Sequence, residues 1–240
     1  MRVSTKGICF PPFARIRALL AVSLLFSLSA PRVHADRGSS EEFLRAWLDQ
    51  QAQVKTWSAD VTQTRKLKSL TRPLESPGKV WFVHPNRFRW QLGEPPRTIA
   101  VRSENELLVL HPRLEQAERY SLGDDLDPAW RQALALLDVG FPSDRDEFYA
   151  QYEPLSATRK GDVWHLVLRP AAQEARRLIE QVRFEVVAED YILRATELVF
   201  PDGSTMRNEF HEHQLNPELD EKLFEVDLSG FEVSDPLDRN

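Results

Sequence analysis

The chain has 240 residues, and its 31 lysines and arginines against 37 aspartates and glutamates give a formal net charge of −6 at pH 7. This length is sufficient for one domain with a sizeable core. The acidic balance argues against nucleic acid or an anionic lipid surface as a binding partner.

The first 35 residues have the pattern of a secretory signal peptide. Two arginines precede an apolar run over residues 18–28, and Val33-His34-Ala35 offers small residues at the two positions that a signal peptidase recognises. The run falls short of the roughly 20 apolar residues that a membrane-spanning helix needs. We therefore predict cleavage before Asp36, leaving residues 36–240 as one extracytoplasmic domain, most simply in a bacterial periplasm.

The composition of the predicted mature chain sets two further expectations. Cys9 is the only cysteine and lies in the signal, so the mature chain would form no disulfide and must depend on its core. Removal of the signal's five basic residues would take the formal net charge from −6 to −11.

The mature chain is predicted to begin with a helix and a long strand. Ser39 can cap the helix with Glu42 completing a capping box, and Trp47 lies on a broad apolar face at helical spacing. A strand follows from Thr56 to about Leu70, in which Trp57 and alternate residues share one face.

The segment from Gly78 to Leu92 predicts two strands joined at a Pro-Asn corner. Val80 to Val83 are all apolar, which predicts a strand covered on both faces. After the corner, Phe88, Trp90 and Leu92 alternate with polar residues, which predicts one apolar face and one basic face. The segment forms either one side of a solid core or the lining of a space for a ligand.

The remaining pattern is β-rich with a helical insertion. Short strands separated by turn residues are expected between residues 98 and 122, and Asp127-Pro128 starts a helix that ends near Gly140. A second short helix follows Ser143, strands resume over 152–214, and Asn216-Pro217 starts a last helix. The expected class is α+β, mainly antiparallel β, with an insertion suited to plug or cover the sheet.

Motifs for catalysis or metal binding are absent from the sequence. It lacks a nucleophile elbow, a phosphate-binding loop, a Cys-x-x-Cys pair and a zinc-protease motif. His211 and His213 would share a strand face with Glu209, but Arg207 on that face is a poor neighbour for a cation. We expect no catalytic residue, metal or cofactor, although a scattered hydrolase triad is a competing possibility. The six tryptophans either line an apolar ligand site or fill the core.

Four motifs resemble the LolA family of periplasmic carriers of outer-membrane lipoproteins. Gly78-Lys-Val-Trp-Phe-Val-His-Pro-Asn-Arg-Phe-Arg-Trp90 resembles the family's Gly-x-Leu-Trp-Val-x-Arg-Pro-x-x-Phe-x-Trp stretch. Val61-Thr-Gln63 is similar to its Phe-Thr-Gln, and His111-Pro-Arg-Leu-Glu-Gln116 to its Asn/Asp-Pro-x-x-x-Gln turn. The end from Leu223 to Val233 resembles its Phe-x-Phe-x-x-Pro-x-Gly-Val tail. The order of elements agrees from Ser39 onwards.

This resemblance implies an unclosed, strongly curved antiparallel β-barrel with an α-helical lid over an apolar cavity. It implies a monomer that takes outer-membrane lipoproteins by their acyl chains from an inner-membrane ABC-type release complex and delivers them to an outer-membrane acceptor. No catalysis and no cofactor are implied. A LolA-like carrier of another lipid, such as a glycolipid or a pigment, is the alternative.

The resemblance also nominates residues. The candidates for lining the cavity or its lid are Trp47, Trp81, Phe88, Trp90, Leu108, Leu110, Leu134, Leu137 and Phe141. We expect Trp81, Leu108 and Leu110 to lie behind Phe88 and Trp90. Where the family has an arginine that holds the lid, this chain has His84, which we expect to contact the lid and whose charge would vary with pH.

Overall fold

The computed structural model describes residues 37–122 and 145–236. Its helices are α1 (Arg37–Gln51), α3 (Arg145–Gln151) and α4 (Gln173–Arg176), with short 3₁₀ helices η1 (Pro112–Leu114) and η3 (Glu221–Phe224). Its strands are β1 (Thr56–Lys66), β2 (Leu74–Val83), β3 (Arg87–Leu92), β4 (Thr98–Arg102), β5 (Glu106–His111), β6 (Gln116–Ser121), β7 (Tyr152–Lys160), β8 (Val163–Pro170), β9 (Gln181–Val187), β10 (Leu193–Val199), β11 (Thr205–Leu215) and β12 (Glu232–Ser234).

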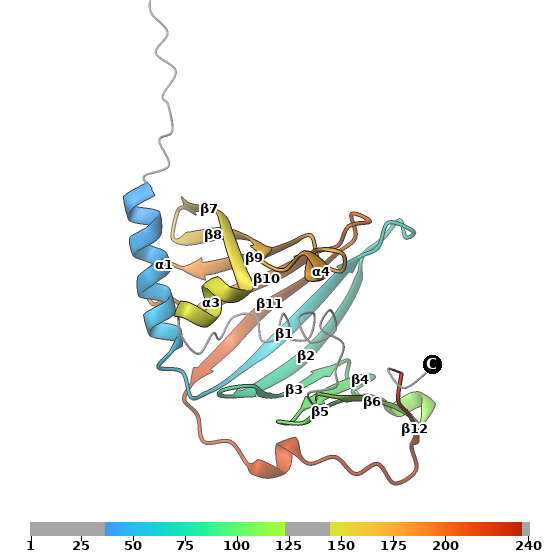
Figure 1. The fold of residues 1–240 in the computed structure, drawn as a ribbon. Helices are drawn as coiled ribbons and strands as arrows, with labels where there is room; N and C mark the ends of the chain where they lie inside the picture. The colour runs from blue at the N-terminus through green and yellow to red at the C-terminus, as the bar shows by residue number, and fades with distance from the viewer. Residues whose placement is uncertain (1–36, 123–144, 237–240) are drawn as a thin grey trace, which may run out of the picture. The chain divides into compact units, whose positions relative to one another are not determined.

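The described strands form one curved, unclosed sheet (Figure 1). Its strand order is β12-β6-β5-β4-β3-β2-β1-β11-β10-β9-β8-β7. Every pairing is antiparallel except that of β12 with β6. The expected class, mainly antiparallel β with a few helices and an unclosed curved sheet, is confirmed.

Side chains alternate between two faces of this sheet. We call the side that carries Trp57, Phe82, Phe88, Trp90 and Phe210 the inner face, because these residues belong to one large core cluster with α1. The other side, the outer face, carries Trp81, Arg87, Arg89, Leu108 and Leu110.

Helix α1 packs its apolar stripe against the inner face near β7, β8 and β9. Phe43, Leu44, Trp47 and Leu48 are buried, as their helical spacing predicts. The Phe43 ring stacks on Trp164 of β8 with centroids 4.5 Å apart. The helix starts at Arg37, before the predicted cap Ser39, and Ser40 Oγ donates a hydrogen bond to the Ala157 carbonyl oxygen at 3.0 Å. Burial of each large apolar side chain contributes about 1.5–3 kcal/mol.

Strand β2 differs from its prediction in two ways. It starts at Leu74 and continues through Pro77, where a connection was expected. Pro77 lacks an N–H, but its carbonyl oxygen still accepts a bond from Gly93 N–H at 2.7 Å. The strand is also not covered on both faces: Val80 and Phe82 are buried on the inner face, whereas Trp81 and Val83 are only half-buried.

A glycine permits β2 and β3 to approach closely. A Cβ atom on Gly78 would lie 1.9 Å from the backbone oxygen of Gln91, so any other residue would push the two strands apart. The close pairing fixes the register in which Phe82 lies opposite Phe88.

The chain after β11 forms a strap, residues 216–234, that ends on the outer face (Figure 1). The helix predicted after Asn216-Pro217 is wrong in extent, since only η3 forms and Asp220 caps it by accepting from Lys222 N–H. Apolar strap side chains pack against Leu108, Leu110 and Ala117; they are Val226, Leu228, Phe231 and Val233.

Candidate functional site

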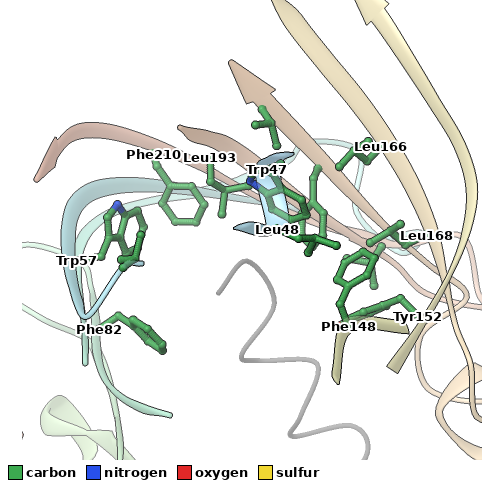
Figure 2. Close-up of a cluster of buried hydrophobic side chains, with 14 of the residues drawn as sticks. Trp47, Leu48, Trp57, Phe82, Phe148, Tyr152, Leu166, Leu168, Leu193 and Phe210 are labelled. Atoms are coloured by element: carbon green, nitrogen blue, oxygen red, sulfur yellow. The ribbon is translucent and has the colours of Figure 1, made fainter. Parts of the chain in front are cut away.

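The inner face between β3 and β11 is lined by aromatic rings (Figure 2). The Phe210 ring lies edge-on to Trp57 at 5.1 Å and to Trp90 at 6.0 Å, measured between centroids. Phe82 lies opposite Trp57 across the β1–β2 pairing and opposite Phe88 across the β2–β3 pairing. This surface is apolar over four adjacent strands.

The apolar surface continues beneath the two helices. Trp47 of α1 is fully buried and contacts Phe148 of α3 at 6.0 Å and Phe184 of β9 at 5.5 Å between ring centroids. Figure 2 shows Trp57 and Phe82 on one side of this cluster and Phe148 and Tyr152 on the other. One connected apolar surface therefore extends from β3 to β8.

A hollow of about 400 Å³ lies beside the two helices. Its lining includes Leu48, Asp49 and Ala52 from α1 and Arg145 and Asp146 from α3. The Arg145 guanidinium donates to both Asp49 carboxylate oxygens, and this bond raises the pKa of Arg145. The exposed ion pair connects α1 to α3 at the edge of the hollow.

Three nitrogen atoms of this region are buried without a partner among the described residues. They are Nε1 of Trp47, Nε1 of Trp90 and Nδ1 of His213. A buried polar group that lacks a hydrogen bond destabilises the fold by about 1–3 kcal/mol. These nitrogen atoms are polar groups at a mostly apolar surface.

His213 reaches the inner face through a bulge in β11. Ser58 pairs with Gln214 while Asp60 pairs with His211, and Glu212 in between has φ 49°. The His213 ring consequently lies 5.9 Å from Trp57 and 6.5 Å from Phe210, whereas His211 is exposed. The expectation that both histidines share one face is wrong, because the extra residue reverses the alternation. Burial lowers the pKa of His213 below its ordinary 6.5.

The β6 end of the inner face is polar. Tyr120 donates a hydrogen bond to Glu118 at 2.7 Å, and burial together with this carboxylate raises the pKa of Tyr120 to about 12. Tyr120 therefore stays protonated and remains a donor near neutral pH.

Three of the nominated residues lie at the inner face. Trp47 of α1 packs against it, Phe88 is 7% exposed on β3, and Trp90 is half-buried two residues later. Their contact with a lipid stays a prediction.

Three other nominated residues lie on the outer face, which corrects the expectation that they stand behind Phe88 and Trp90. Trp81 pairs with Arg89 and lines a polar hollow of about 230 Å³ with Asp60 and Lys79. Leu108 and Leu110 pack beneath the strap. Neighbouring residues of a strand point to opposite faces, so Leu107, buried in the large cluster, takes the inner position on β5.

The nominated lid residues Leu134, Leu137 and Phe141 lie outside the described residues. His84 is half-buried at the β2–β3 corner, where its backbone N–H donates to the Lys55 carbonyl oxygen at 2.8 Å. Its contact with a lid stays a prediction.

Neither a metal cluster nor a membrane-crossing helix occurs in the ranges that the structure describes. No group of three or more His, Cys, Asp and Glu side chains there is arranged to hold a metal ion. No described helix combines the length and apolarity needed to span a membrane.

A comparison with protein-family models identifies the family of this chain. The model of the family "Outer membrane lipoprotein carrier protein LolA" matches residues 52–227. The chain belongs to the LolA family.

Individual curated relatives match a shorter part of the chain than the family model does. The outer-membrane lipoprotein carrier protein of Salmonella paratyphi B is 33% identical over 105 residues, which are 44% of this chain and 49% of that protein. The match thus spans about half the length of the curated relatives.

Two solved structures are similar at 12% identity. A conserved protein of Thermus thermophilus has a TM-score of 0.48 over 82% of this chain and 99% of its own. A LolA superfamily protein of Nitrosomonas europaea has 0.39 over 75% and 96%.

Several residues that the structure brings together at the inner face were not nominated from the sequence. They are Trp57, Phe82 and Phe210 on the sheet and Phe148 on α3, and all belong to the apolar cluster. The alternation around Trp57 carried a signal for its face, whereas the uniformly apolar run around Phe82 carried none. Phe210 lies beside the bulge, which no local pattern indicates, so its meeting with Trp90 depends on the tertiary fold.

Proposed function

We propose that this LolA-family protein carries lipoproteins through the periplasm by holding their acyl chains against its inner face. The observation that supports this proposal is the connected apolar surface, built from Trp57, Phe82, Trp90 and Phe210 and continued beneath α1. Each CH₂ group moved from water to such a surface gains about 0.8 kcal/mol. An acyl chain therefore has a strong driving force to enter, without any chemical step.

The transfer route is part of the same proposal. We infer release of lipoproteins by an inner-membrane ABC-type complex and delivery to an outer-membrane acceptor. The family match and the curated relatives named as outer-membrane lipoprotein carriers support this route. The proposal needs no catalytic residue and no cofactor, and it takes the protein to be a monomer.

A periplasmic location is proposed from the N-terminal pattern. N-terminal sequencing after cell fractionation tests it, with a periplasmic product starting at Asp36 expected. A chain retained in the inner membrane with residues 1–35 intact would contradict this location.

A second candidate is a LolA-like carrier of another lipid, such as a glycolipid or a pigment. His84 favours it, because it stands where the resemblance places the arginine that holds the lid. Mass spectrometry of the molecules that copurify from native periplasm separates the candidates: acylated lipoprotein supports the first, and glycolipid or pigment supports the second.

The carrier function is tested with a radiolabelled acylated lipoprotein in spheroplasts. The purified protein is expected to release the lipoprotein into solution as a complex and to return it intact. Ala100→Glu should impair release, because Ala100 lies between Trp90 and Val109 on the inner face. The matched control is Val167→Glu on the outer face of β8, where the new carboxylate lies opposite Arg183. A deacylated product would identify a hydrolase and refute the carrier proposal.

A further inference from the structure

We propose that the Trp90 indole N–H recognises the carbonyl oxygen of an ester-linked acyl chain. The inference rests on the proposed carrier function and adds a specificity to it. A purely apolar surface binds any hydrocarbon of suitable size, whereas a donor within it distinguishes an acyl ester from an ether-linked chain of equal length.

The indole N–H of Trp90 is a buried donor. Its Nε1 atom has no hydrogen-bond partner among the described residues. Buried polar groups in folded proteins are nearly always paired, so an unpaired donor requires an explanation. A phenylalanine at this position would keep an aromatic ring and leave no donor unpaired.

The surroundings of Trp90 strengthen a hydrogen bond formed there. Its cross-strand neighbours are Val80 on β2 and Ala100 on β4, and its ring lies edge-on to Phe210. In such an apolar environment a hydrogen bond is electrostatically stronger than in water. The acceptor must come with the ligand, and the carbonyl next to an acyl chain is an acceptor attached to the hydrocarbon that this surface takes.

Trp47 has a second unpaired indole N–H but is less suited to this role. Its side chain is fully buried between Phe148 and Phe184, whereas Trp90 is only half-buried. A ligand can therefore approach the exposed part of the Trp90 side chain without displacing the packing of α1.

The test compares methyl dodecanoate with methyl dodecyl ether, which share a hydrocarbon chain and differ in the carbonyl group. Each competes with the fluorophore N-phenyl-1-naphthylamine for the purified full-length protein. The native protein should bind the ester roughly two- to tenfold more tightly than the ether, the effect of one hydrogen bond. Trp90→Phe should abolish this preference. Trp81→Phe removes an indole N–H from the outer face and should retain it.

An independent measurement needs no variant. In a ¹H–¹⁵N spectrum, the Trp90 indole N–H signal, assigned through its contacts with the Phe210 ring, should move downfield with the ester and not with the ether. Equal affinity for both probes, or an unmoved signal, would overturn this inference and leave the carrier proposal intact. If neither probe displaces the fluorophore, the carrier proposal fails and this inference fails with it.

Discussion

The indole ring of Trp90 on β3 lies edge-on to the phenyl ring of Phe210 on β11, with centroids 6.0 Å apart. Strands β2 and β1 lie between them in the sheet. Three strand spacings would separate their backbones by about 14 Å in a flat sheet. The two side chains meet because the sheet bends toward this face. Their contact therefore shows that the inner face is concave.

Phe210 is therefore expected to be important for the fold. Phe210→Ala removes its edge contacts with Trp57 and Trp90 and should lower the free energy of unfolding by about 3–5 kcal/mol. His211→Ala, at the exposed neighbouring position, is the control and should stay within about 0.5 kcal/mol of the parent. Urea denaturation measures both. Similar losses in the two variants would show that the ring contacts contribute little.

Stability should depend on pH through His213. Its neutral ring is held against Trp57 and Phe210, with Nε2 near the Phe210 carbonyl oxygen at 3.1 Å. Because burial lowers the folded-state pKa, the unfolded chain takes up a proton first as pH falls below about 6.5. The contribution of His213 is therefore complete above that pH and is lost as pH falls toward the folded-state pKa.

The charged neighbours of His213 have opposing effects on its pKa. Asp190 and Glu212 favour its protonation, and His211 opposes it, but burial is the largest influence. The measurement is the melting temperature of the parent and of His213→Gln between pH 7.5 and 5. The parent should lose more stability than the variant over this range, and parallel curves would contradict the assignment to His213.

Two arginines that the sequence presented only as a basic strand face hold the strap. Arg89 Nη1 donates to the Leu223 carbonyl oxygen at 3.0 Å, and burial lowers the pKa of Arg89. Arg87 pairs with Glu221 at 2.6 Å and lies 4.7 Å above the Phe224 ring centroid. The predicted basic face of β3 is thus the surface on which the strap packs.

Arg89→Met keeps an unbranched side chain but removes the guanidinium, so it should loosen the strap. Hydrogen bonds from charged groups contribute about 1.5–3 kcal/mol, which sets the expected loss in unfolding free energy. Hydrogen exchange of residues 216–234 should accelerate as the strap detaches. Arg183→Met is the control, since Arg183 of β9 pairs with Glu197 of the neighbouring strand β10. Unchanged exchange in Arg89→Met would show that apolar packing alone holds the strap.

Local pattern predicted much of this fold. The apolar stripe of α1 and the alternation in β1 and β3 each follow from a period that one segment contains. The four motifs in order indicated the family, which the match over residues 52–227 confirms.

What local pattern missed has a common physical origin. The run Val80 to Val83 is uniformly apolar and gives no sign of which residues face inward. Leu107, Leu108 and Leu110 raise the same ambiguity, and only the strap resolves it by covering the outer face with Phe231 and other apolar residues. A one-residue shift in such a strand exchanges its faces. The site residues Trp81, Leu108 and Leu110 were misplaced for this reason.

Phe88 provides the sharpest test of how the inner face is used. It is 7% exposed, lies opposite Phe82 and Arg102 in its strand pairs, and belongs to the large cluster. If it fills the core, Phe88→Ala should lower the free energy of unfolding by about 3 kcal/mol or more. If it lines the entrance to a lipid site, stability should fall modestly while acyl-ligand binding is badly impaired. The burial of Phe88 favours the first result.

Phe88→Glu separates these roles further. A carboxylate among Phe82 and its neighbours is costly to bury unpaired, so this variant should be less stable than Phe88→Ala if the ring is part of the core. Phe88→Leu is the control, because it keeps an apolar side chain and should preserve most of both properties. Thermal melting and fluorophore displacement by methyl dodecanoate, below the melting temperature of every variant, measure the two properties independently. If Phe88→Ala and Phe88→Glu both bind the ester as the parent does, Phe88 lies outside the lipid site.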